Sequence, residues 1–76
     1  LEMWLEKMED NNFTNPNEVI TNFPGADTIG NGRIVFNIAH NKYRLIGYFR
    51  YRFYAVYVRF IGTHAEYNNI HDIKNI

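Results

Sequence analysis

The chain has 76 residues and a formal net charge of zero; 46% of its side chains are hydrophobic, 17% are aromatic, and none is cysteine. This length supports one domain whose core is near the smallest that can offset chain entropy, and the apolar content excludes a disordered chain. The lack of cysteine excludes disulfides and thiolate metal sites and fits a reducing, cytoplasmic setting. No apolar run approaches the roughly 18 residues of a membrane span, so we expect no membrane contact.

The neutral total hides an uneven distribution of charge. Residues 1–27 hold one lysine against six acidic residues, a net charge of −5, whereas residues 28–76 hold seven basic against two acidic residues, a net charge of +5. A polyanion responds to a local positive face and not to the total charge. The second part of the chain is therefore the place to look for a phosphate-bearing partner.

Two helices are predicted in the acidic part. Apolar residues follow the i, i+3, i+4, i+7 spacing of one helix face from the first residue onward: Leu1, Trp4, Leu5 and Met8. The sequence Asn-Pro-Asn-Glu at 15–18 combines an N-cap, a proline at the first helical position and the glutamate of a capping box, so a short second helix follows. We expect this helix to end at residues 23–25 and residues 24–32 to form a loop.

From Arg33 onward, a period of two predicts an antiparallel meander of at least three strands. Turns at residues 40–41 and 52–53 place six pairs opposite one another: Ile38–Tyr43, Phe36–Leu45, Ile34–Gly47, Phe49–Val56, Gly47–Val58 and Leu45–Phe60. The predicted fold class is therefore α+β, with the N-terminal helices packed on the apolar sheet face formed by Ile34, Phe36, Ile38, Leu45, Phe49, Val56, Val58 and Phe60.

The opposite sheet face is expected to be open and basic. It carries arginine and tyrosine side chains with three apolar ones among them: Arg33, Asn37, Arg44, Tyr48, Arg50, Tyr57 and Arg59, with Val35, Ile46 and Ile61. Guanidinium groups fork onto phosphates and aromatic rings stack on unpaired bases, which suits single-stranded nucleic acid. An ordinary solvated strand surface explains the same pattern.

The spacing of Thr63 and Glu66 predicts a last short helix that begins near His64 and carries Tyr67 and Ile70. His64 is a candidate for proton transfer, and Tyr67, three residues further on, lies on the same helical side. A surface histidine at a helix cap and a packed tyrosine are the non-catalytic alternatives. Lys42 and Arg44 flank the first hairpin and add positive charge at the edge of the sheet near His64. No histidine spacing resembles a zinc pattern, so we expect no metal and no other cofactor.

Three blocks carry a resemblance to a known family: NGRIVFNI at 31–38, NKYRL at 41–45 and VRFIGTHAEY at 58–67. With them the chain resembles the HigB-type toxins of the RelE-like superfamily of bacterial toxin–antitoxin systems, from about Trp4 to Ile70. We therefore expect residues 1–76 to form a single RelE/HigB-like toxin domain that lacks its N-terminal strand and first helix. Asn68 and Asn69 stand where the resemblance leads us to expect an acidic residue.

The resemblance implies a RelE-like fold and a cytoplasmic mRNA endoribonuclease (an mRNA interferase) that works on the ribosome and inhibits translation. It also implies a cognate antitoxin with a helix-turn-helix domain, through which alone operator DNA would be contacted. In this superfamily the RNA 2′-hydroxyl is the nucleophile and no metal takes part. Carried onto this chain, Arg59 would stabilise the phosphate, His64 would transfer protons and Tyr67 would assist. RNA and phosphate binding would fall to Lys42, Arg44, Arg33, Tyr48, Tyr57 and Arg50.

Two other interpretations stay open at this point. One is a non-catalytic module that binds RNA or the antitoxin. The other is a basic face that docks on an acidic protein segment without any role for RNA.

Overall fold

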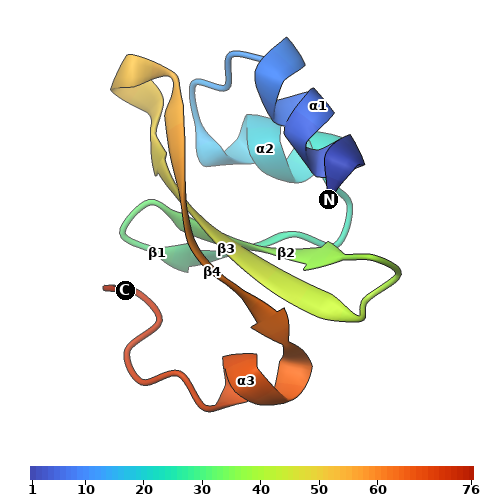
Figure 1. Cartoon of the computed structure of the whole chain (residues 1–76). Helices are drawn as coiled ribbons and strands as arrows, with labels where there is room; N and C mark the ends of the chain where they lie inside the picture. Colours follow the sequence, from blue (N-terminus) through green and yellow to red (C-terminus); the bar gives the residue numbers. More distant parts are fainter.

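A computed structural model describes all residues from 1 to 76. The elements follow the order α1 (Glu2–Asp10), α2 (Pro16–Asn22), β1 (Asp27–Gly30), β2 (Arg33–Ile38), β3 (Tyr43–Arg50), a short 3-10 turn (Tyr51–Phe53), β4 (Ala55–Thr63) and α3 (His64–Asn68). The four strands form one antiparallel sheet in the order β1-β2-β3-β4, which confirms the predicted α+β meander. Helices α1 and α2 lie on one side of the sheet, and α3 with the C-terminal tail lies on the other (Figure 1).

The two N-terminal helices form where the sequence predicts them. Asn15 caps α2, because its Oδ1 accepts a hydrogen bond of 3.0 Å from the Glu18 backbone N–H. The Glu18 carboxylate accepts from the Thr14 backbone N–H at 2.7 Å, one residue before the position that a capping box requires. In α1 only half of the predicted apolar face packs, since Trp4 is buried whereas Leu1 and Leu5 remain exposed.

Part of the predicted loop at 24–32 is a strand, which corrects the sequence interpretation. β1 pairs with β2 through Asp27↔Val35, Thr28↔Ile34 and Gly30↔Arg33. The hairpin turns at Asn31 and Gly32, whose φ angles are +50° and +79°. An Asn-Gly pair is a strong hairpin signal because both residues tolerate this left-handed backbone. The signal was present in the sequence, but Asp27–Gly30 is too short and too polar to show a period of two.

The predicted register holds for β2–β3 and for the first half of β3–β4. Phe36 lies opposite Leu45, and Phe49 lies opposite Val56. The predicted Leu45–Phe60 pair is wrong: Leu45 lies opposite Ile61, because a β-bulge between Ile46 and Gly47 leaves Arg59 on β4 without a partner. One extra residue exchanges the two faces beyond it, so Phe60 leaves the helix side of the sheet and Ile61 takes that side.

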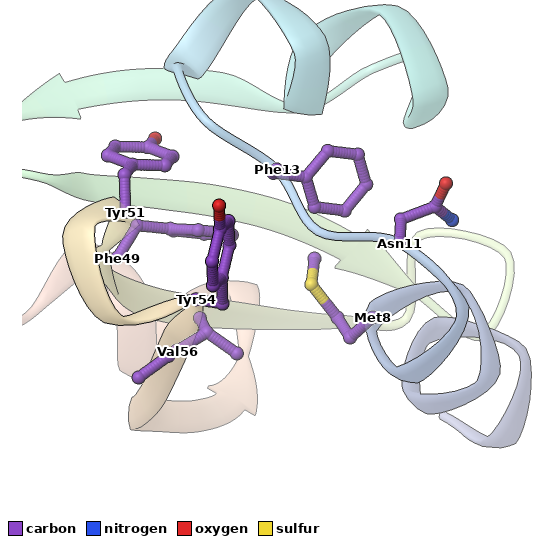
Figure 2. Close-up of a pocket in the computed structure, with 8 residues that line it drawn as sticks. Met8, Asn11, Phe13, Phe49, Tyr51, Tyr54 and Val56 are labelled. Carbon is purple, nitrogen blue, oxygen red and sulfur yellow. The ribbon is translucent and has the colours of Figure 1, made fainter.

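The main core lies between the sheet and helices α1 and α2. Its nine buried members are Trp4, Phe13, Val19, Ala26, Ile34, Phe36, Ile38, Leu45 and Phe49. Phe36 lies at the centre, with its ring centroid 5.5 Å from that of Trp4 and 5.1 Å from that of Phe23, both in edge-on geometry. Figure 2 shows one end of this core, where Met8, Phe13 and the base of the β3–β4 hairpin surround a pocket of about 30 Å³.

Candidate functional site

The second face of the sheet, opposite α1 and α2, is organised in three rows across β2, β3 and β4. The strand registers give Arg33–Tyr48–Tyr57, then Val35–Ile46–Phe60, then Asn37–Arg44–Gly62. The middle row is apolar: Val35 and Ile46 are buried and Phe60 is half-buried. The expectation of an open face is therefore wrong for this row, which forms a second, smaller core. The backbone of α3 and of the tail lies on this side of the sheet (Figure 1). Charged and aromatic side chains remain on both sides of the row.

The α3 group, defined here as Arg44, His64 and Tyr67, lies at one end of this face. The Arg44 guanidinium carbon is 4.7 Å from the centroid of the Tyr67 ring, a cation–π contact. His64 is the first residue of α3 and directly follows Thr63, which pairs with Tyr43 on β3. The His64 Nε2 and Arg44 Nε atoms are buried and have no hydrogen-bond partner. Buried polar atoms without partners are rare in folded proteins, and a bound ligand is one way to satisfy them.

A complete capping box fixes the start of α3. The Thr63 hydroxyl accepts a hydrogen bond of 3.1 Å from the Glu66 backbone N–H, and the Glu66 carboxylate accepts one of 2.8 Å from the Thr63 backbone N–H. Hydrogen bonding of the Glu66 carboxylate by the Thr63 backbone N–H, and secondly by the Thr63 side chain, holds the pKa of Glu66 below its usual value. Glu66 therefore serves the cap, and the cap holds His64 and Tyr67 against the end of the sheet.

The Tyr48 group, defined here as Tyr48, Tyr57, Arg33, Arg50 and Arg59, lies on the other side of the apolar row. The guanidinium carbons of Arg33, Arg59 and Arg50 lie 4.0, 5.5 and 5.8 Å from the centroid of the Tyr48 ring. The Tyr57 ring lies 6.5 Å from the same ring. Three cations around one phenol repel one another and attract an anion to the space between them. Arg33 is partly engaged, because it donates to the backbone oxygens of Asn31 and Ile76 at 2.8 and 2.9 Å.

Residues 1–70 match a family model described as HigB_toxin, the RelE-like toxic component of a toxin–antitoxin system. The chain belongs to this family. Membership makes the protein the toxin of such a system, and a cognate antitoxin is its partner. The comparison with curated proteins finds no match to this sequence.

The toxin's candidate residues fall into the two groups instead of one. Arg59 and His64 are five positions apart, so at about 3.3 Å per residue their backbones are separated by roughly 16 Å. Arg44 and Tyr67, by contrast, are in direct contact. Lys42 is exposed in the β2–β3 turn, next to the Tyr43–Thr63 pair and hence at the α3 end of the sheet. Arg50 lies at the far end of β3, beside the β3–β4 turn.

Phe60 is the member of this surface that the sequence misplaced. The Phe60 ring centroid lies 6.4 Å from that of Tyr67. The Phe60 side chain therefore lies between the α3 group and the Tyr48 group. No sequence signal predicts that Phe60 lies on this face, because the bulge at Arg59 interrupts an otherwise regular alternation of side chains along β4. No three His, Cys, Asp or Glu side chains of the toxin gather as a metal-holding group. None of its helices has the length or the apolar content needed to cross a bilayer.

Proposed function

We propose that the toxin is a cytoplasmic, ribosome-dependent mRNA endoribonuclease that inhibits translation and is neutralised by an antitoxin carrying a helix-turn-helix domain. The observation that carries this proposal is that His64, whose buried Nε2 has no partner, begins the same short helix that carries Tyr67, and the Tyr67 ring contacts Arg44, in a chain of the toxin family. An imidazole, a phenol and a guanidinium supply a proton acceptor, a proton donor and a fixed positive charge. Cleavage of RNA by its own 2′-hydroxyl needs these three functions.

His64, Tyr67 and Arg44 account for both proton transfers and for the charge that develops in the proposed reaction. His64 Nε2 takes the proton of the 2′-hydroxyl while the 2′-oxygen forms a bond to phosphorus. The bond from phosphorus to the 5′-oxygen breaks, and that oxygen receives a proton from the Tyr67 hydroxyl. The products are a 2′,3′-cyclic phosphate and a free 5′-hydroxyl, and proton exchange with water restores both side chains. Arg44 stabilises the extra negative charge on the phosphoryl oxygens.

The Tyr48 group is assigned to RNA binding next to the reacting phosphate. Because roughly 16 Å separates the backbones of Arg59 and His64, we assign Arg59 to the phosphate of a neighbouring nucleotide. Arg33, Arg50 and Tyr48 bind the same segment, and Tyr57 offers a ring for base stacking. Lys42 adds charge at the α3 end.

The test is inducible expression of the full reading frame in bacteria, followed by mapping of mRNA 5′ ends on translated transcripts. Wild type is compared with His64→Ala, Arg59→Ala and the matched control His71→Ala, which changes an exposed histidine of the tail. We expect new ends within codons for wild type and the control, and a loss of about 100-fold or more for His64→Ala, the scale of general acid–base catalysis. Folded wild-type protein that produces no new ends would leave a non-catalytic module that binds RNA or antitoxin.

A further inference from the structure

The tip of the β3–β4 hairpin presents two large aromatic side chains to solvent. Phe53 is 63% exposed and Tyr54 is 64% exposed. Tyr54 has a φ of +52°, a left-handed conformation in which glycine or asparagine is the usual residue. Tyr54 lines the pocket at the end of the core, whereas Phe53 does not. An exposed aromatic pair at a hairpin tip, with Tyr54 held in an unfavourable backbone conformation, points to a role in binding.

The base of this tip is firmly anchored. The Tyr51 ring stacks on Phe49 with 5.4 Å between centroids and 19° between planes. Figure 2 shows Tyr54 next to Val56 and Tyr51 near Phe49, at the end of the core that Met8 and Phe13 complete. A platform held in this way loses little conformational entropy when it binds a partner.

The tip continues the positive surface of the Tyr48 group. The guanidinium carbon of Arg50 lies 5.8 Å from the Tyr48 ring centroid and 5.5 Å from the Phe53 ring centroid, so it joins the two rings. Arg52 is exposed within the tip itself. No acidic residue occurs anywhere between Asp27 and Glu66. Cations and rings therefore follow one another from Tyr57 to Phe53 with no opposing charge in the sequence between them.

We propose that Phe53, flanked by Arg50 and Arg52, is a base-stacking subsite for the RNA strand that the toxin cleaves. The inference rests on the proposed ribonuclease function and adds a contact remote from the reaction. The nine residues of β4 separate the tip from His64, which corresponds to about 30 Å of extended strand. Phe53 thus contacts nucleotides well outside the cleaved bond, and the continuous surface from Tyr48 favours the same strand over ribosomal RNA.

The experiment measures RNA binding by the full chain carrying His64→Ala, so that cleavage does not interfere. The probe is a fluorescent single-stranded RNA of about 12 nucleotides, within the range of single-strand site sizes, and the contrast is the same sequence as a duplex. Phe53→Ala should raise the Kd for the single strand at least about fivefold, because stacking contributes about 1 kcal/mol or more per base. Duplex binding should not change, because paired bases cannot stack on the ring.

Three further variants separate stacking from charge and from folding. Phe53→Trp should retain affinity, and Arg52→Gln should reduce the slope of log K against log salt by about 0.7 for a single strand. Met3→Ala, which alters a side chain 75% exposed on α1, should change neither quantity. Unfolding curves confirm that each variant is folded.

Two results would overturn the inference. One is a Phe53→Ala variant whose Kd for the single-stranded RNA is unchanged. If that variant instead loses only affinity for ribosomes free of mRNA, Phe53 binds ribosomal RNA and the inference is equally wrong. The other is a His64→Ala protein that binds no single-stranded RNA at any salt concentration. Cleavage that survives His64→Ala in cells would contradict the proposed catalytic site instead, and the binding result would still decide the role of Phe53.

Discussion

Replacement of Gly62 by alanine should loosen the site without touching any of the proposed reacting groups. Gly62 lies opposite Arg44, one residue before the Thr63 cap. A methyl group there would stand 2.7 Å from Phe60 Cζ and 2.9 Å from Glu66 Oε1, both closer than side chains tolerate. The Gly62 φ lies outside the left-handed region, so the cost of the change is steric. Either the Phe60 ring or the Glu66 carboxylate has to move.

Both displacements disturb α3. The Phe60 ring packs 6.4 Å from Tyr67, and Glu66 Oε1 holds the Thr63 backbone N–H at 2.8 Å. One added methyl group in a packed region costs about 1–3 kcal/mol, and each kcal/mol lowers the Tm of a domain of this size by about 4–8 °C. Urea unfolding of Gly62→Ala measures the loss, and RNA cleavage by the same variant should fall with it.

A second substitution tests whether the clash is the cause. Phe60→Leu shortens the side chain that the new methyl group meets, so the double variant should lose less stability than the sum of the two single variants. The expected coupling is about 0.5 kcal/mol or more. If Gly62→Ala unfolds within about 0.5 kcal/mol of wild type, or if the two changes are additive, the steric reasoning is wrong.

Three other substitutions test the core, the hairpin base and the cap. Phe36→Ala should cost about 3–5 kcal/mol in urea unfolding, since the Phe36 ring contacts Trp4 and Phe23 at the centre of the core; a loss below about 1 kcal/mol would contradict that central role. Burial raises the pKa of Tyr51 from 10.0 to about 12, so its contribution to stability is complete below pH 10 and is lost as the pH rises through about 12. Tyr51→Phe should remove that part of the alkaline decline while leaving stability at neutral pH equal or higher, because the Tyr51 hydroxyl has no partner. The lowered pKa of Glu66 makes its contribution to stability complete above the ordinary value of 4.5 and lost as the pH falls through the lowered value, so Glu66→Gln should flatten this acid limb of the stability curve.

Local signals in the sequence were sufficient for most of the fold. The Asn15 and Thr63 caps mark helix starts, and both lie where the spacing predicts. The β2–β3 register follows from strict alternation of apolar residues around a turn at His40 and Asn41, whose φ angles are +56° and +69°. Each of these features depends on neighbours within a few residues, which a sequence pattern records directly.

The features that escaped prediction depend on contacts between distant residues. β1 exists because it pairs with β2, and the bulge at Arg59 exists because β4 must fit β3. The division of the candidate site follows from that bulge, which directs Phe60 into the second core between Arg44 and Tyr48. A regular alternation places Phe60 on the helix side of the sheet, so it does not predict that this ring lies between Arg44 and Tyr48.

Arg59 has no partner on β3, so the alternation of side chains between the two faces of the sheet changes phase at this position of β4. From Ala55 to Val58, even-numbered side chains belong to the helix side of the sheet; from Phe60 to Thr63, odd-numbered side chains do. Deleting Arg59 would restore a single phase and leave Phe60 in the second core and Ile61 on the helix side, because Phe60 would then directly follow Val58. The same deletion in the turns at 39–42 or 51–54 would leave the phase of β4 intact. The bulge therefore adds one residue that the ladder itself does not need, so deletion of Arg59 should keep both faces of β4 and remove only the Arg59 contact with the Tyr48 ring.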